Sequence, residues 1–239
     1  MLKKVGIAVA VVLVLLLVII ATRPSTYQVV RKTTVAAPGE VAYGFVADFH
    51  RWSEWSPWDK LDPNQKRTFE GPAAGEGAIY HWAGNDQVGE GRMTIVGAKS
   101  NSQLDIKLEF IKPFASTNQT LFDFIGQGTT GSEIVWTMNG HNDFMGKAMS
   151  LFMDMDKMIG PDFEKGLAQL KTVVEAEAKK RAEAAAKAAE EAAKVAAAAA
   201  ANPVQAPAAS AGIAPPPVHV EPPPPPMGGS TITAPPAAK

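Results

Sequence analysis

The sequence predicts an α+β domain in which one curved antiparallel sheet of about seven strands wraps around a long C-terminal helix. Seven strand-like segments occur, and no helical pattern separates the last six, so neighbouring strands must pair antiparallel. After the last strand, apolar residues recur in steps of three and four along one side of a helix, and that side needs a sheet to cover it. All 18 aromatic residues lie between Tyr27 and Phe163, so this middle region holds the core of the 239-residue chain.

The chain begins with a basic N-terminus, residues 1–4, followed by an uncharged run of mostly Val, Leu, Ile and Ala at residues 5–22. As a helix this run would extend roughly 27 Å, close to the thickness of a bilayer core. We therefore expect a single-pass transmembrane anchor, with a cleaved signal peptide or a buried core helix as alternatives. Basic residues flank both ends, but the immediate flanks, with Lys3 and Lys4, favour an N-terminus inside the cell. The body would then lie outside the cytoplasm, which in a Gram-negative cell means the periplasm.

The body, residues 26–174, opens with a strand at 27–35 and a short amphipathic helix from Pro38 to about Phe49. The clearest strand, 104–110, alternates apolar with charged residues, which is typical of an antiparallel strand with one wet face. Weaker strand patterns, each closed by turn-forming residues, lie at 65–71, 78–83, 91–97, 117–125 and 132–140.

A helical pattern from Phe152 to Val174 ends the body, and Gly160-Pro161 interrupts it. Because proline removes a backbone donor and clashes with the preceding turn, we expect a kink or a division at about Ile159. Residues 175–201 hold 16 Ala, five basic and five acidic residues, which predicts an exposed helical spacer. Residues 202–239 contain 12 Pro and predict a disordered tail, either passive or in contact with an envelope protein.

Composition and motifs exclude several classes of function. The net charge of -1 provides no case for nucleic-acid binding, and the absence of Cys removes disulfides and thiolate sites. The G-x-G-x-x-G match at 126–131 precedes a strand instead of a helix, so it predicts a hairpin turn. Asp154-Met155-Asp156 lacks the later oxygen ligand and glycine of a calcium loop. We therefore predict neither a metal site nor a cofactor.

Five segments of the body carry a family resemblance: 35–38, 48–58, 89–93, 136–138 and 153–158. With these segments the chain resembles the START-like (SRPBCC) superfamily, in its polyketide cyclase/dehydrase branch, over about residues 26–174. The resemblance implies a helix-grip fold with an apolar cavity that in relatives holds lipids, sterols, polyketides or other hydrophobic molecules. Fold alone does not decide between carriage and catalysis.

Under this resemblance, inward strand positions and one side of the last helix would line a ligand cavity. These residues are Trp82, Met93, Ile95, Ile106, Leu108, Phe110, Phe122, Phe124, Trp136 and Met138 on the strands, and Met155, Ile159 and Phe163 on the helix. The alternative is that they fill a core without a cavity. Trp52, Trp55 and Trp58 would form either the mouth of the pocket or a structural plug that closes one end of the sheet.

We expect this domain to bind a hydrophobic small molecule or lipid. The first alternative is a cyclase/dehydrase-like enzyme that uses the same cavity, with His81, His50 or a buried carboxylate as the acid–base group. His50 would then pair with Glu54, four residues further on. The second alternative is a ligand-free module that contacts an envelope partner, which a solidly filled interior would favour.

Overall fold

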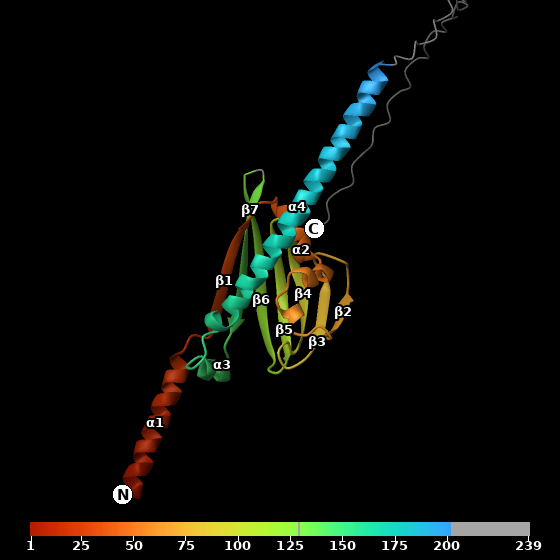
Figure 1. Cartoon of the computed structure of the whole chain (residues 1–239). Helices are drawn as coiled ribbons and strands as arrows, with labels where there is room; N and C mark the ends of the chain where they lie inside the picture. The colour runs from red at the N-terminus through yellow and green to blue at the C-terminus, as the bar shows by residue number, and fades with distance from the viewer. Residues whose placement is uncertain (129, 202–239) are drawn as a thin grey trace, which may run out of the picture. The chain divides into compact units, whose positions relative to one another are not determined.

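The computed structural model describes residues 1–128 and 130–201 (Figure 1). The predicted tail at 202–239 lies outside the described residues, as does Thr129 in the predicted turn at 126–131. The helical elements, in chain order, are α1 (Leu2–Thr22), α2 (Gly39–Ala47), the 3₁₀ helices η1 (Phe49–Glu54) and η2 (Trp58–Lys60), α3 (Phe144–Met149) and α4 (Met155–Ala201). The strands are β1 (Thr26–Val35), β2 (Lys66–Glu70), β3 (Ile79–Ala83), β4 (Glu90–Lys99), β5 (Gln103–Lys112), β6 (Ser116–Gln127) and β7 (Gly131–His141).

The seven strands form one antiparallel sheet in the order β1-β7-β6-β5-β4-β3-β2. Strand β1 pairs with β7, so the first and last strands are neighbours and the other strands form a meander. Side chains alternate strictly between the two faces: along β7, Ser132, Ile134, Trp136 and Met138 are buried while the residues between them are partly exposed. The predicted order of elements and the antiparallel pairing are confirmed.

Helix α4 packs across the inner face of this sheet (Figure 1). Its apolar side buries Phe163, Leu167, Leu170 and Val174, each at most 2% exposed. Because these positions follow three- and four-residue steps, they lie on one side of the helix and fill the concavity of the sheet. The chain thus adopts the helix-grip fold that the sequence predicted.

The predicted division of the last helix is wrong. Helix α4 begins at Met155, where the Asp154 side chain accepts the Asp156 backbone N–H at 3.0 Å, and it continues through Pro161. A proline inside a helix removes only one backbone hydrogen bond, and the buried apolar side of the helix offsets that loss. Phe152, which the sequence placed on this side, precedes the helix and is 88% exposed.

Arg31 of β1 holds the first turns of α4 on the sheet. Its Nη1 lies 2.8 Å from Asp156 Oδ1, and its Nε lies 2.7 Å from Glu164 Oε1. These two carboxylates are eight residues apart on one side of the helix, and the guanidinium lies over Gly160 between them. A side chain at position 160 would occupy the place of the guanidinium, so this glycine makes the close approach of β1 and α4 feasible.

Candidate functional site

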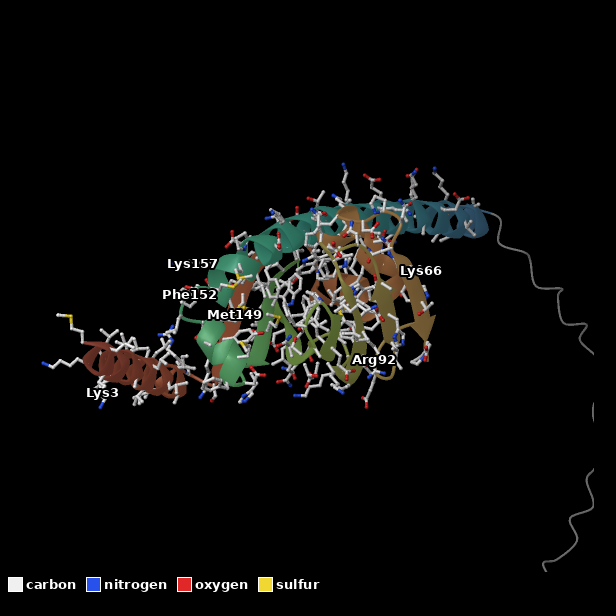
Figure 2. All side chains as sticks on the ribbon, turned by 90° about the horizontal axis from the view of Figure 1, so that it is seen from below. Lys3, Lys66, Arg92, Met149, Phe152 and Lys157 are labelled. Carbon is white, nitrogen blue, oxygen red and sulfur yellow. The ribbon has the colours of Figure 1, made fainter. Side chains whose placement is uncertain are left out.

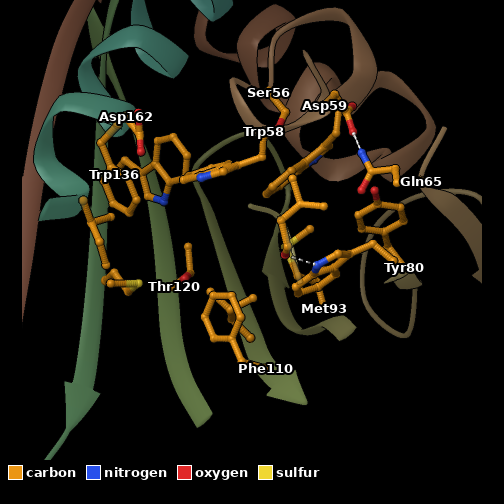
Figure 3. Close-up of a pocket in the computed structure, with 17 residues that line it drawn as sticks. Ser56, Trp58, Asp59, Gln65, Tyr80, Met93, Phe110, Thr120, Trp136 and Asp162 are labelled. Atoms are coloured by element: carbon orange, nitrogen blue, oxygen red, sulfur yellow. Dashed lines mark hydrogen bonds between the residues drawn. The ribbon is translucent and has the colours of Figure 1, made fainter. Parts of the chain in front are cut away.

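A cavity of about 190 Å³ lies between the inner face of the sheet, the 3₁₀ helices and the first turns of α4 (Figure 3). Most of its wall is apolar and aromatic. The predicted cavity residues that line it are Trp82, Met93, Leu108, Phe110, Trp136, Met138, Ile159 and Phe163. The cavity is also lined by residues that the sequence did not predict there: Val88 and the polar residues Ser56, Asp59, Gln65, Tyr80, Thr120 and Asp162.

Stacked aromatic rings form the wall where β7 meets α4. The rings of Trp136 and Phe163 stack at 3.8 Å between centroids, with 12° between their planes. Trp58 meets both rings edge-on, at 5.9 Å from Trp136 and 6.2 Å from Phe163. These contacts join Trp58, β7 and α4 in one continuous aromatic wall.

Trp82 forms the opposite wall and depends on a glycine in the neighbouring strand. Gly91 of β4 pairs with Trp82 of β3, and a Cβ atom at Gly91 would collide with the indole ring. The Trp82 ring also donates its N–H to the Val88 carbonyl at 3.0 Å and meets Phe110 edge-on at 5.8 Å. Gly91 therefore lets the indole lie flat over the strand and bound the cavity.

A polar cluster lies at one end of the cavity, around the carboxylate of Asp59. Its Oδ1 accepts a hydrogen bond from Gln65 Nε2 at 2.8 Å and lies 3.1 Å from Arg67 Nη2. Burial raises the pKa of Asp59, and the charge of Arg67 and the hydrogen bond from Gln65 offset part of this rise. Burial, followed by the nearby Asp59 charge, raises the pKa of Tyr80 to about 12. The Tyr80 hydroxyl is therefore protonated at neutral pH.

The buried tryptophans differ in how their N–H groups are satisfied. Trp52 donates to the Val46 carbonyl at 2.9 Å, and Trp55 donates to the Phe45 carbonyl at 3.2 Å. Trp136 is equally buried, yet its Nε1 has no partner within the described residues. The hydroxyl of Thr120, which also lines the cavity, likewise has none there. A buried polar atom without a partner costs about 1–3 kcal/mol of folding free energy.

Five predicted cavity residues lie elsewhere. Phe122 and Phe124 are on the inner face of β6, but they pack edge-on against Trp55 and Tyr43. The α2–η1 segment thus covers this half of the sheet, and the cavity lies under the other half. The residues outside the lining are Ile95, Ile106, Phe122 and Phe124, all buried in the core, and Met155, partly exposed at the start of α4.

The three tryptophans of the 3₁₀ segment occupy different positions relative to the cavity. Trp55 is completely buried behind Trp136, with ring centroids 5.7 Å apart, and it does not line the cavity. Trp52 and Trp58 line the cavity, and Trp58 is partly exposed. The segment therefore serves both the core and the cavity wall.

Neither predicted histidine lines the main cavity. His50 Nδ1 lies 2.8 Å from Asp48 Oδ1, so the expected pairing with Glu54 is wrong. The segment is a 3₁₀ helix with three residues per turn, which aligns Glu54 with Arg51, and these two pair at 2.9 Å. His50 contributes instead to a second cavity of about 160 Å³. His81 Nε2 lies 3.3 Å from Glu70 Oε1, outside both cavities.

Comparison with known proteins finds similar folds in distant sequences, and no curated protein matches the chain. A protein from Chromobacterium violaceum has 13% identity and a TM-score of 0.45, with 64% of this chain and 98% of that chain covered. Truncated norcoclaurine synthase from Thalictrum flavum has 12% identity and a TM-score of 0.46, with 62% and 93% covered. A protein of unknown function from Staphylococcus aureus has 10% identity and a TM-score of 0.48, with 66% and 99% covered.

The family described as polyketide cyclase/dehydrase and lipid transport matches residues 26–175. This match begins at β1 and includes all seven strands together with the part of α4 that packs on the sheet. The chain therefore belongs to the polyketide cyclase/dehydrase and lipid transport family, within the START-like (SRPBCC) superfamily.

Proposed function

We propose that this protein is a membrane-anchored binding protein for a hydrophobic small molecule or lipid. The cavity under α4 carries this proposal, because its wall is mainly aromatic and aliphatic. Its volume of about 190 Å³ is small for a ligand site. An apolar cavity of about 150 Å³ is known to accept benzene, so the enclosed part of the ligand has roughly the size of one ring or a short acyl segment.

Helix α1 supports the membrane attachment. It spans 21 residues with a mean hydropathy of 3.2 over its most apolar window, of which only 6% is buried. Its Val, Leu and Ile side chains are about half exposed, for example Leu13 at 54% and Leu17 at 52%. An apolar surface of this length matches a bilayer core. We place the N-terminus inside the cell and the folded body outside the cytoplasm, as in a periplasm.

A second exposed apolar group adjoins the end of α1. Phe144, Met145 and Met149 of α3 are 55%, 67% and 45% exposed, and Phe152 just beyond is 88% exposed. Figure 2 shows Met149 and Phe152 at the end of the body that faces α1. A hydrogen bond joins the end of α1 to the end of α3: Arg23 Nη2 donates to the carbonyl of Ser150 at 2.8 Å. If α1 spans the membrane, these exposed apolar residues of α3 and Phe152 would reach the interfacial layer of the bilayer.

The alternative of an enzyme depends on Asp59. Its carboxyl has a raised pKa and lines the cavity together with Tyr80, whereas His50 and His81 do not line it. A buried carboxyl of this kind suits general acid–base catalysis. However, Gln65 and Arg67 both bind the same oxygen of Asp59, which is typical of a carboxylate that holds a fold together. Binding without turnover is therefore the function that the geometry supports best.

The test is ligand occupancy of the full chain, purified in lipid nanodiscs and examined by native mass spectrometry and solvent extraction. Leu108→Trp places a bulky indole ring in the cavity, and Ile111→Trp adds the same ring at a 50% exposed position of the same strand. We expect one bound hydrophobic molecule per chain in the wild type and in Ile111→Trp, and none in Leu108→Trp. Empty wild-type protein that also rejects apolar probes would favour a ligand-free interaction module instead.

A further inference from the structure

The two polar atoms without partners in the cavity wall belong to adjacent strands and to the same face. Thr120 of β6 pairs with Met138 of β7, and Trp136 lies two positions away from Met138 on β7. Diagonal neighbours of this kind lie about 7–8 Å apart at the backbone, so their side chains belong to the same region of the sheet face. In Figure 3 the indole nitrogen of Trp136 is on the edge of its ring that faces Thr120. The two atoms therefore lie in the same part of the cavity wall.

Because Trp136 Nε1 and Thr120 Oγ1 are buried, they indicate which hydrogen-bonding group a ligand should carry. Trp136 is 2% exposed and Thr120 is 3% exposed, so bulk water does not satisfy them. The other buried side-chain atoms without partners, on Arg67, Asp105 and Gln169, do not line this cavity. An indole N–H only donates, whereas a hydroxyl donates or accepts. The group that satisfies both must accordingly be a hydrogen-bond acceptor.

The charges around the cavity restrict the acceptor further. The charged side chains in its wall are Asp59 and Asp162, and among the described residues no Lys, Arg or His lines it. An anionic group would meet two acidic side chains and lose its hydration without gaining a counter-ion. A carboxylate or phosphate is thus a poor ligand for the interior of this cavity.

Given the proposed function, we infer that the cavity selects a neutral hydrophobic molecule with one hydrogen-bond-accepting oxygen, such as a ketone, an aldehyde or an ester. The oxygen accepts the Trp136 N–H and the Thr120 O–H, while the hydrocarbon part fills the space between Trp82, Phe110 and Phe163. A pure hydrocarbon leaves both polar atoms without a partner. An anionic lipid headgroup stays outside the cavity.

Two probes of nearly equal shape test this inference: acetophenone carries the carbonyl oxygen, and α-methylstyrene has a CH₂ group in its place. Their dissociation constants are measured by equilibrium dialysis on the full chain in nanodiscs, with Leu108→Trp nanodiscs as the background for partition into lipid. The ratio of the two constants is compared between the wild type and each variant, because this comparison cancels the different hydration of the probes. Benzoate serves as the anionic probe of similar size.

The variants are Trp136→Phe, which removes the N–H, and Thr120→Val, which removes the hydroxyl at nearly constant volume. We expect the preference for acetophenone to fall about tenfold in Trp136→Phe and several-fold in Thr120→Val, as for loss of one hydrogen bond. Thr117→Val makes the same change at an exposed position of β6 and should leave the ratio unchanged. Thermal unfolding of each variant verifies that it is folded. If Trp136→Phe does not fold, Thr120→Val still tests the inference.

The outcomes separate this inference from the proposed function. Saturable binding of both probes with an unchanged ratio in Trp136→Phe and Thr120→Val would overturn the assigned acceptor site, although the hydrophobic cavity would stand. Benzoate binding as tight as that of acetophenone would overturn the selection for a neutral ligand. Saturable binding of none of the three probes would contradict the proposed function itself, and the inference with it.

Discussion

The ring of Trp136 stacks on the ring of Phe163 at 3.8 Å between centroids, so one contact both joins strand β7 to helix α4 and forms a wall of the cavity. Removing either ring therefore changes stability and the shape of the site together. This coupling determines how variants of the cavity should be designed, because a loss of binding has to be distinguished from a loss of the fold.

Phe163→Ala should lower the free energy of unfolding by about 3–5 kcal/mol, since it empties a fully buried position in the core. Phe163 is 2% exposed and also meets Trp58 edge-on. Chemical denaturation of the full chain in detergent measures the change. Phe152→Ala removes the same ring at an 88% exposed site and should change stability by less than about 0.5 kcal/mol. Equal losses in the two variants would contradict the packing described above.

Gly91→Ala should destabilise the fold by about 1–3 kcal/mol and disturb the cavity, because the new methyl group displaces the Trp82 indole. It would also approach the Glu109 carbonyl oxygen to 2.6 Å. Gly97→Ala on the same strand is the matched control, since its methyl group would lie 3.5 Å from the Asp105 side chain. Tryptophan fluorescence and acetophenone binding should change in Gly91→Ala alone. Normal binding by Gly91→Ala would show that the position of Trp82 does not shape the site.

The ion pairs of Arg31 should make stability depend on acidity. Hydrogen bonds from Arg31 hold the pKa of Asp156 below its usual value, so the folded chain binds this proton less readily than the unfolded chain does. The contribution is present above the unfolded pKa of about 4 and is lost as the pH falls through the lower folded pKa. Asp156→Asn should therefore be less stable than the wild type at pH 7, with a difference that shrinks towards pH 3.

Unfolding curves at several pH values measure this difference. Asp86→Asn, at an exposed loop position, is the control and should follow the wild type throughout. A stability difference between Asp156→Asn and the wild type that stays constant from pH 7 to pH 3 would show that the pair with Arg31 does not stabilise the fold.

Val12→Arg should lower the fraction of the protein held in membranes, because a charge at the centre of a membrane-spanning helix costs about 2.5–3.5 kcal/mol. Val12 lies in the middle of α1, and Thr22→Arg adds the same charge at its end. Extraction of membranes with alkaline carbonate should leave the wild type and Thr22→Arg in the pellet and release a larger fraction of Val12→Arg. An intact mass of the mature protein that lacks residues 1–22 would identify a cleaved signal peptide and refute the anchor.

The sequence alone determined the elements and their order, because these depend on local periodicity. Strict alternation at Leu104, Ile106 and Leu108 identified a strand with one buried face, and the steps from Phe163 to Val174 identified the helix that covers the sheet. Prediction from the sequence failed where the local periodicity was weak or misleading. Helix α3 is only six residues long, too short to show periodicity, and Pro161 suggested an end to a helix that the packed face continues.

Only the tertiary structure decided which inward residues line a cavity. Phe122 and Trp136 occupy the same face of the sheet and pair directly, yet α2 and η1 cover the first while the second borders open space. The polar members of the site, such as Asp59 and Thr120, come from segments far apart in the chain. Their partners, and the lack of partners for Trp136 Nε1 and Thr120 Oγ1, depend on how distant elements meet, and no periodicity in the sequence encodes that.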